Sequence, residues 1–138
     1  MALDGWEYEI VAAAEGFVDA GPGDGAGALR ALYETVSSAP GAVTAVLGRP
    51  CDRETADNWI RNDALHELAF ALAGRAGLIV SRTPTGDASA TLVASGLFEE
   101  VTWTSASVPL AVGAALATGL VSWSSEVREV PQASRATH

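Results

Sequence analysis

The chain contains no lysine, and its eight basic residues, all arginines, stand against 17 aspartates and glutamates, which leaves a formal net charge of −9. Proteins that bind nucleic acid need a basic patch to neutralise phosphates, and the sequence shows none. Anionic membrane surfaces likewise attract basic segments. The charge therefore argues against nucleic acid and against membranes as partners.

Cysteine and histidine are nearly absent as well. The one cysteine, Cys51, cannot form a disulfide within the chain, so it indicates nothing about an oxidising compartment. The segment HELAF begins like the HExxH motif of zinc proteases, but Phe70 stands where the second histidine would be. The other histidine, His138, is the final residue. We therefore expect no metal and no cofactor.

The residue types of a cysteine nucleophile and its base occur in one stretch, as Cys51, Asp63 and His66. If a helix begins at Arg53, however, the thiol lies roughly 20 Å from the imidazole at about 1.5 Å of rise per residue. A catalytic arrangement within this stretch is geometrically poor. The sequence thus predicts no catalytic residue, and we expect the protein not to be an enzyme.

Signals for export and membrane insertion are also missing. The N-terminal residues MALDGWEYE are acidic and lack the basic segment of a signal peptide. The longest apolar run, residues 108–121, contains Pro109, Gly113 and Gly119, and it is shorter than the roughly 20 residues that span a bilayer. We expect synthesis in the cytoplasm, as a soluble protein or as a component of a larger particle.

Apolar residues recur at helical spacing in the first half of the chain and predict helices over about 5–20, 25–38 and 53–76. Asp52 precedes the third of these in a position suited to an N-cap. The glycine-rich segment 21–27 neither follows a predicted strand nor contains a lysine. We interpret it as a flexible linker and not as a phosphate-binding loop.

The second half of the chain changes to strand-like patterns. The strand-like segments are residues 77–82, 88–95, 97–104 and 122–130. The segment from Leu110 to Leu120, rich in alanine and glycine, fits either a buried pair of strands or a closely packed helix. For the adjacent Glu99 and Glu100, we expect that one must face inward or that the pair lies at an edge of the sheet.

Helices followed by strands predict an α+β fold. We expect the N-terminal helices to pack on a small, mainly antiparallel sheet built from residues 77–130. The sequence shows no internal repeat. We therefore expect a single domain over residues 1–130 and a polar C-terminal tail over residues 131–138.

The predicted third helix has two apolar sides. At about 100° per residue, one side carries aliphatic residues that suit a core. The other side carries Trp59, Asp63, His66 and Phe70, spaced four, three and four residues apart. A surface helix normally shows water a polar side, so two large aromatics there indicate a protein interface. These four are the candidate interface residues.

Charged residues make up only 18% of the chain, which is low for a small monomer that must cover its own surface. With no complete site visible, this predicts a non-catalytic structural or assembly subunit. It would form a homo-oligomer or dock in a larger protein complex, for example a viral tail or head-connector particle. The alternative is a small-molecule-binding or enzymatic domain with a pocket between helices and sheet, near Trp103, Trp123 and the Glu99–Glu100 pair.

Overall fold

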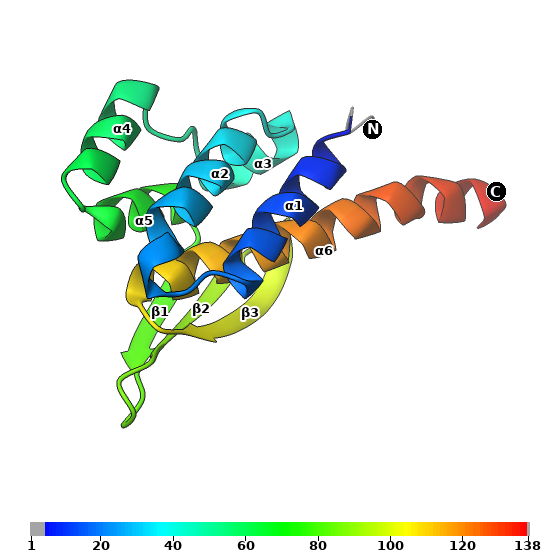
Figure 1. Cartoon of the computed structure of the whole chain (residues 1–138). Coiled ribbons are helices and arrows are strands. Elements are labelled where there is room, and N and C mark those ends of the chain that lie inside the picture. The colour runs from blue at the N-terminus through cyan, green and yellow to red at the C-terminus, as the bar shows by residue number, and fades with distance from the viewer. Residues whose placement is uncertain (1–4, 138) are drawn as a thin grey trace.

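The computed structural model describes the backbone of residues 5–137 and the side chains of residues 5–127 other than Pro22. The helices are α1 (Trp6–Val18), the short 3-10 helix η1 (Pro22–Asp24), α2 (Gly25–Ser37), α3 (Gly41–Leu47), α4 (Arg53–Arg61), α5 (Leu65–Ala73) and α6 (Val108–Thr137), and the strands are β1 (Gly77–Arg82), β2 (Ala88–Ala94) and β3 (Phe98–Ser105). Within this part of the chain, five α-helices precede a three-stranded sheet and one long helix follows it (Figure 1). The expected α+β fold is confirmed.

The first two expected helices are confirmed as α1 and α2. The expected linker 21–27 is shorter than predicted, because η1 occupies part of it and α2 begins at Gly25. Trp6 opens α1 and is only 2% exposed. Its indole N–H donates to the Thr35 carbonyl of α2 at 2.7 Å, and its ring meets Trp123 of α6 edge to face, with centroids 6.1 Å apart. Trp6 thus joins α1, α2 and α6.

The expected single helix over 53–76 is wrong, because the chain breaks it between α4 and α5. Asp63 has a left-handed backbone with φ of 55°, and the Ala64 N–H donates to the Trp59 carbonyl at 2.7 Å. Asn and Asp enter this conformation more readily than other residues with side chains, so Asn62–Asp63 is a local stop. The helix begins as expected, since Asp52 accepts a hydrogen bond from the Thr55 N–H at 2.8 Å.

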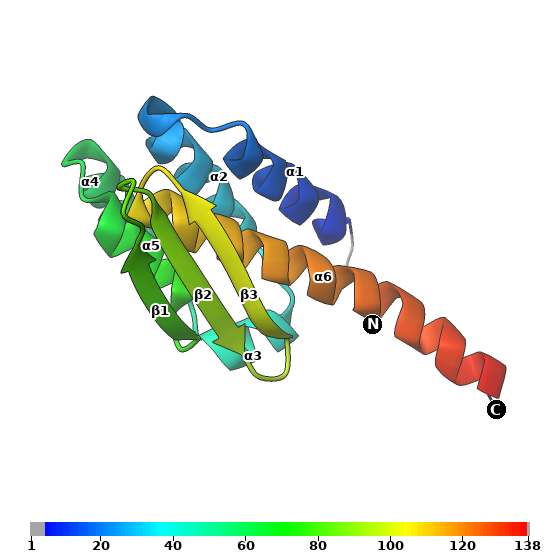
Figure 2. The ribbon, with the colours of Figure 1, turned by 90° about the horizontal axis from the view of Figure 1, so that it is seen from below.

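The sheet is antiparallel, as expected, with the strand order β1-β2-β3. Alternate residues of β2, Ala88, Ala90 and Leu92, are completely buried. They face α6, which runs behind the sheet in Figure 2 and leaves the front face open. The sheet therefore has one covered face, as the period-2 pattern of burial along β2 requires.

The segment 110–120 is helical, which decides between the two alternatives that the sequence left open. The expected strand over 122–130 is wrong, because α6 continues through it, and the sheet ends at Ser105. Trp123, Val127 and Val130 are spaced four and three residues apart, which is a helical spacing. The backbone of the expected tail also belongs to α6 as far as Thr137, while the last residue lies outside the described part.

Two glycines let α6 approach its neighbours closely. A Cβ atom on Gly113 would lie 2.6 Å from the ring of Phe17 in α1, and one on Gly119 would lie 2.7 Å from the ring of Phe98 in β3. Both rings are almost fully buried. The first helix and the last strand therefore both pack directly on the backbone of α6, which is the central helix of the fold.

The length of α6 corrects one expectation from the sequence. The apolar run is not too short to span a bilayer, because Val108–Val127 forms one continuous helix that is long and apolar enough. In this fold, however, 78% of its most apolar window is buried inside the protein. A helix that is apolar on all sides is also what the centre of a folded domain requires.

Candidate functional site

The two edges of the sheet are built differently. β3 forms one edge, and its register against β2 is interrupted between Leu92 and Ala94, where β3 carries an extra residue. The bulge lets both Glu99 and Glu100 be exposed, so the expected edge location of this pair is confirmed. Bulges and charges are the usual devices that keep an edge strand from pairing with another chain. The β3 edge is protected.

β1 forms the other edge and has none of these devices. Its register against β2 runs without interruption from Gly77 to Arg82, it contains no proline, and its single charged residue lies at its end. Ile79 is 71% exposed and Val80 is 36% exposed. Within the described residues, the strand's backbone bonds only to β2. The outer edge of β1 therefore presents unpaired backbone groups beside exposed apolar side chains.

The four predicted interface residues do not form one continuous line, because the helix that would align them is broken. Trp59 lies on α4, half-buried and packed against the core, and Asp63 is exposed in the break. His66 and Phe70 remain exposed neighbours on α5, with ring centroids 6.3 Å apart. The structure thus leaves a pair of exposed aromatic rings instead of a four-residue seam.

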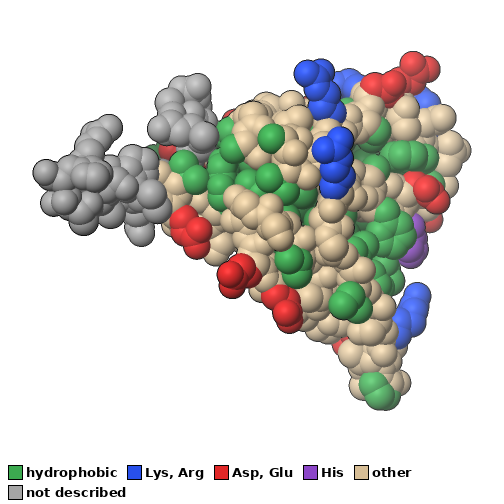
Figure 3. Space-filling view, turned by 180° about the vertical axis from the view of Figure 1, so that it is seen from behind, with side chains coloured by type: hydrophobic (Ala, Val, Ile, Leu, Met, Phe, Trp, Pro, Cys, Tyr) green, Lys and Arg blue, Asp and Glu red, His purple; other side chains and the backbone are tan. Residues whose placement is uncertain are grey.

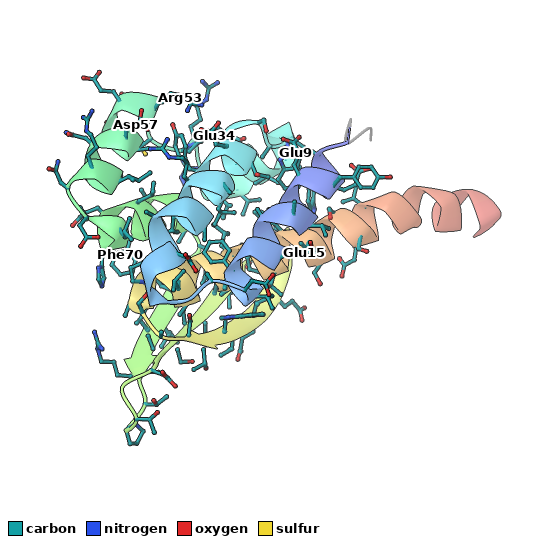
Figure 4. All side chains as sticks on the ribbon, in the orientation of Figure 1. Glu9, Glu15, Glu34, Arg53, Asp57 and Phe70 are labelled. Carbon is teal, nitrogen blue, oxygen red and sulfur yellow. The ribbon has the colours of Figure 1, made fainter. Side chains whose placement is uncertain are left out.

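This aromatic pair and β1 lie on the same side of the molecule. Figures 1 and 2 both place α5 next to β1 at one flank, away from the far end of α6. In Figure 4, Phe70 lies at this flank below α4, and its side chain is 42% exposed. We call His66, Phe70, Ile79 and Val80 the β1–α5 surface. It combines an open strand edge, with Val80 on the α6 side of the sheet and Ile79 on the open side, with the two exposed rings of α5.

Cys51 does not have the surroundings of an activated nucleophile. It lies in the loop between α3 and α4, partly buried, and its backbone carbonyl accepts a hydrogen bond from the Tyr33 hydroxyl at 2.7 Å. Burial, and secondarily the carboxylate of Asp52, raises the pKa of its thiol above the ordinary value. Reactive cysteines have lowered pKa values. The chemistry considered for Cys51, Asp63 and His66 therefore finds no support in this geometry.

The pocket expected under the alternative hypothesis differs from the depression that the structure has beside Glu99 and Glu100. A broad, open depression of about 790 Å³ lies between β3 and α6, and its lining includes Glu99, Glu100 and Glu126. The two tryptophans expected beside it do not line it; Trp123 is buried against Trp6. Among the described residues, no group of three or more histidine, cysteine or acidic side chains could hold a metal ion. The depression is an acidic surface without a convergent set of ligands.

Two ion pairs attach α4 to α2. Arg53 donates two hydrogen bonds to the Glu34 carboxylate, at 2.6 and 2.9 Å, and Arg30 donates to Asp57 at 2.8 Å. Figure 4 shows Glu34, Arg53 and Asp57 at the corner where the two helices meet. Of the residues in α4 only Ala56 is fully buried, so its attachment depends more on charge than that of the other helices.

Acidification is expected to loosen α4 from α2. The hydrogen bond from Arg53 lowers the pKa of Glu34, and hydrogen bonding by Thr55 lowers the pKa of Asp52. A carboxyl whose pKa is lowered on folding stabilises the fold above its unfolded pKa, and this is lost as the pH falls through the folded value. The contribution of Glu34 should therefore be complete well above pH 4.5, its ordinary pKa, and disappear below it.

Melting temperatures of the wild type and of Glu34→Gln, measured between pH 7 and pH 3, test this expectation. The difference between the two proteins should be largest near neutral pH and vanish in acid. Glu15→Gln on α1 is the matched control, since Glu15 is exposed and makes no ion pair within the described residues. A difference for Glu34→Gln that stays constant with pH would contradict the role of the ion pair.

The open edge of β1 and the α2–α4 ion pairs were both missed by the sequence reasoning. The order of strands in a sheet is a long-range property, and nothing within residues 77–82 states that this strand has one free edge.

Comparison of the chain with protein-family models, with curated proteins and with solved structures finds no match. The function is therefore inferred from the residues of the chain itself.

Proposed function

We propose that the protein is a non-catalytic assembly subunit that self-associates through the β1–α5 surface. The observation that carries this proposal is the unprotected edge of β1 with Ile79 71% exposed. An exposed, regular, apolar edge strand pairs readily with another strand. The contrast with β3, whose edge carries a bulge and two glutamates, supports β1 as the edge that is meant to pair.

A second copy of β1 is a suitable partner for this edge. Two antiparallel β1 strands related by a two-fold axis would join two sheets into one of six strands, and a contact of this kind is closed and self-complementary. If the two-fold axis is perpendicular to the sheet, the same face of both sheets points to the same side. Residues near Ile79 and Val80 then lie beside the same residues of the second copy. The strand contains no acidic residue, although the chain has a net charge of −9, so the central contact avoids carboxylate repulsion.

The exposed rings of α5 would extend this contact. His66 and Phe70 lie at the same flank as β1, and large aromatic side chains at the rim of a strand pairing add apolar area to it. Trp59 would contribute indirectly, through the packing of α4 on the core. Asp63 would fix the break that orients α5.

Sedimentation equilibrium of the purified chain tests the proposal. We expect the wild type to associate reversibly. Ile79→Lys should remain folded, but its association should be at least about thirtyfold weaker, because two lysines would face each other near the axis. Phe70→Ala should weaken association by a smaller factor. Val18→Lys is the matched control. Val18, like Ile79, is a β-branched apolar residue with an exposed side chain (65%), but it lies on α1.

Two results would contradict the proposal. One is a wild type that sediments as a monomer at all concentrations, which would exclude self-association. The other is equal association of Ile79→Lys and Val18→Lys, which would place the contact away from β1. Circular dichroism of each variant shows that any loss of association occurs in a folded protein.

A further inference from the structure

A second depression lies beside α3 and is lined by cationic instead of acidic side chains. Arg49 and Arg75 line it together with the small polar residues Ser37, Thr44 and Cys51. No aspartate or glutamate lines it. Figure 3 shows the rear face, where cationic side chains near the top lie apart from a row of acidic side chains below them. This depression is distinct from the β1–α5 surface.

The backbone brings the two arginines together. The N–H of Arg75 donates to the Leu47 carbonyl at the end of α3, at 3.1 Å. The guanidinium of Arg75 then lies over Gly48, with Nε 3.5 Å and Cζ 3.8 Å from where a Cβ would stand on that glycine. Gly48 has a φ of 91°, which favours glycine, and Arg49 follows it directly. The fold therefore places one arginine against the backbone that carries the other.

Neither arginine is neutralised by the described part of the chain. Arg30 and Arg53 form ion pairs, whereas Arg49 and Arg75 form none with the described acidic residues. Two guanidinium groups on one depression repel each other unless an anion lies between them. The carbonyls at the end of α3 do not replace that anion, because Thr44 and Leu47 already accept backbone hydrogen bonds from Gly48 and Arg75.

We propose that this depression binds an oxyanion, namely the phosphate or carboxylate group of a small molecule without an aromatic ring. Guanidinium groups bind both oxyanions through paired hydrogen bonds, and the hydroxyls of Ser37 and Thr44 can donate to the same group. The lining contains no aromatic side chain on which a base could stack. The proposal does not rest on self-association through β1.

Calorimetric titration at low ionic strength, with inorganic phosphate and with succinate in separate experiments, tests the site. We expect one saturable site per chain for at least one of the two anions. Arg49→Gln and Arg75→Gln should each weaken binding about tenfold or more, because each removes charged hydrogen bonds to the anion. Arg75→Lys should fall between these and the wild type, since lysine keeps the charge but not the paired geometry.

Arg82→Gln is the matched control, because it removes the same charge from an exposed arginine on β1. Its affinity should equal that of the wild type. Binding of phosphate alone supports a phosphate-bearing ligand, binding of succinate alone supports a carboxylate-bearing one, and binding of both supports the shared oxyanion site. The absence of saturable binding by either anion would overturn the proposal, as would an equal loss in Arg75→Gln and Arg82→Gln. If Arg75→Gln does not fold, the affinities of Arg49→Gln and Arg75→Lys test the oxyanion site in its place.

Discussion

Replacement of Trp6 by alanine is expected to lower the free energy of unfolding by about 3–5 kcal/mol, the usual range for truncating a large buried aromatic. Trp6 is 2% exposed, and its ring meets that of Trp123, so the substitution would open a cavity where α1 crosses α6. Few neighbours can move in to fill it, because Gly113 already holds α1 against the backbone of α6 through Phe17. Chemical denaturation followed by circular dichroism measures the loss.

Two further variants separate the parts of this effect. Trp6→Phe keeps most of the apolar contact and removes the N–H that donates to Thr35. It should cost about 1 kcal/mol, because the Thr35 carbonyl still accepts from the Ser38 N–H at 3.2 Å and is not left unpaired. Tyr8→Ala, on the same helix but 70% exposed, should change stability by less than about 0.5 kcal/mol. Equal stability of Trp6→Ala and Tyr8→Ala would show that Trp6 does not hold the core together.

The elements predicted correctly from the sequence are those that local chemistry decides. The helical spacing of Ile10 and Phe17 in α1 and of Leu29 and Leu32 in α2 reflects burial of one side of each helix. The Asp52 cap needs only the N–H group of Thr55, three residues away. The turn between β1 and β2 follows from its proline and glycine. In each case the residues that determine the structure are close in sequence.

Besides the broken helix over 53–76, the incorrect predictions concern α6, where the pattern is lost because the helix is buried on all sides. From Leu110 to Ala117 every residue is buried, so no polar face marks the period of 3.6 residues. By helix propensity alone, Gly113 and Gly119 weaken a helix. Because they have no side chain, however, the rings of Phe17 and Phe98 can pack against the backbone of α6. That gain comes from residues far away in the chain, and no local pattern contains it.

The candidate sites were predictable only in part for the same reason. The exposure of Phe70 and His66 followed from the sequence, but their alignment with Trp59 assumed a straight helix that Asp63 interrupts. The grouping of Arg49 with Arg75 depends on the return of the chain from α5 to the end of α3. Low overall charge indicated contact surfaces without locating them. The order of the strands determines where the β1–α5 surface lies, and one glycine determines where the cationic depression lies.

That glycine is Gly74, and its replacement by alanine is expected to be among the most damaging single-methyl changes in the chain. Its backbone, with φ of 56° and ψ of −120°, is one that residues with a Cβ rarely adopt. A Cβ there would also lie 2.2 Å from the Leu47 carbonyl oxygen, which is held in place by the Arg75 N–H. Backbone strain and overpacking each cost about 1–3 kcal/mol. The melting temperature should therefore fall by about 10 °C or more.

Gly86→Ala separates the two causes, because Gly86 also has a positive φ, of 95°, but a Cβ there would meet nothing within 4 Å. It should show the backbone strain without the clash and melt well above Gly74→Ala. If the two variants melt together, Gly74 does not approach Leu47 as closely as the fold requires. In that event Arg75 is not fixed beside Arg49 either, because the same contact between α5 and α3 positions its guanidinium. The stability of Gly74→Ala thus tests the packing of α5 on α3 and the foundation of the cationic depression together.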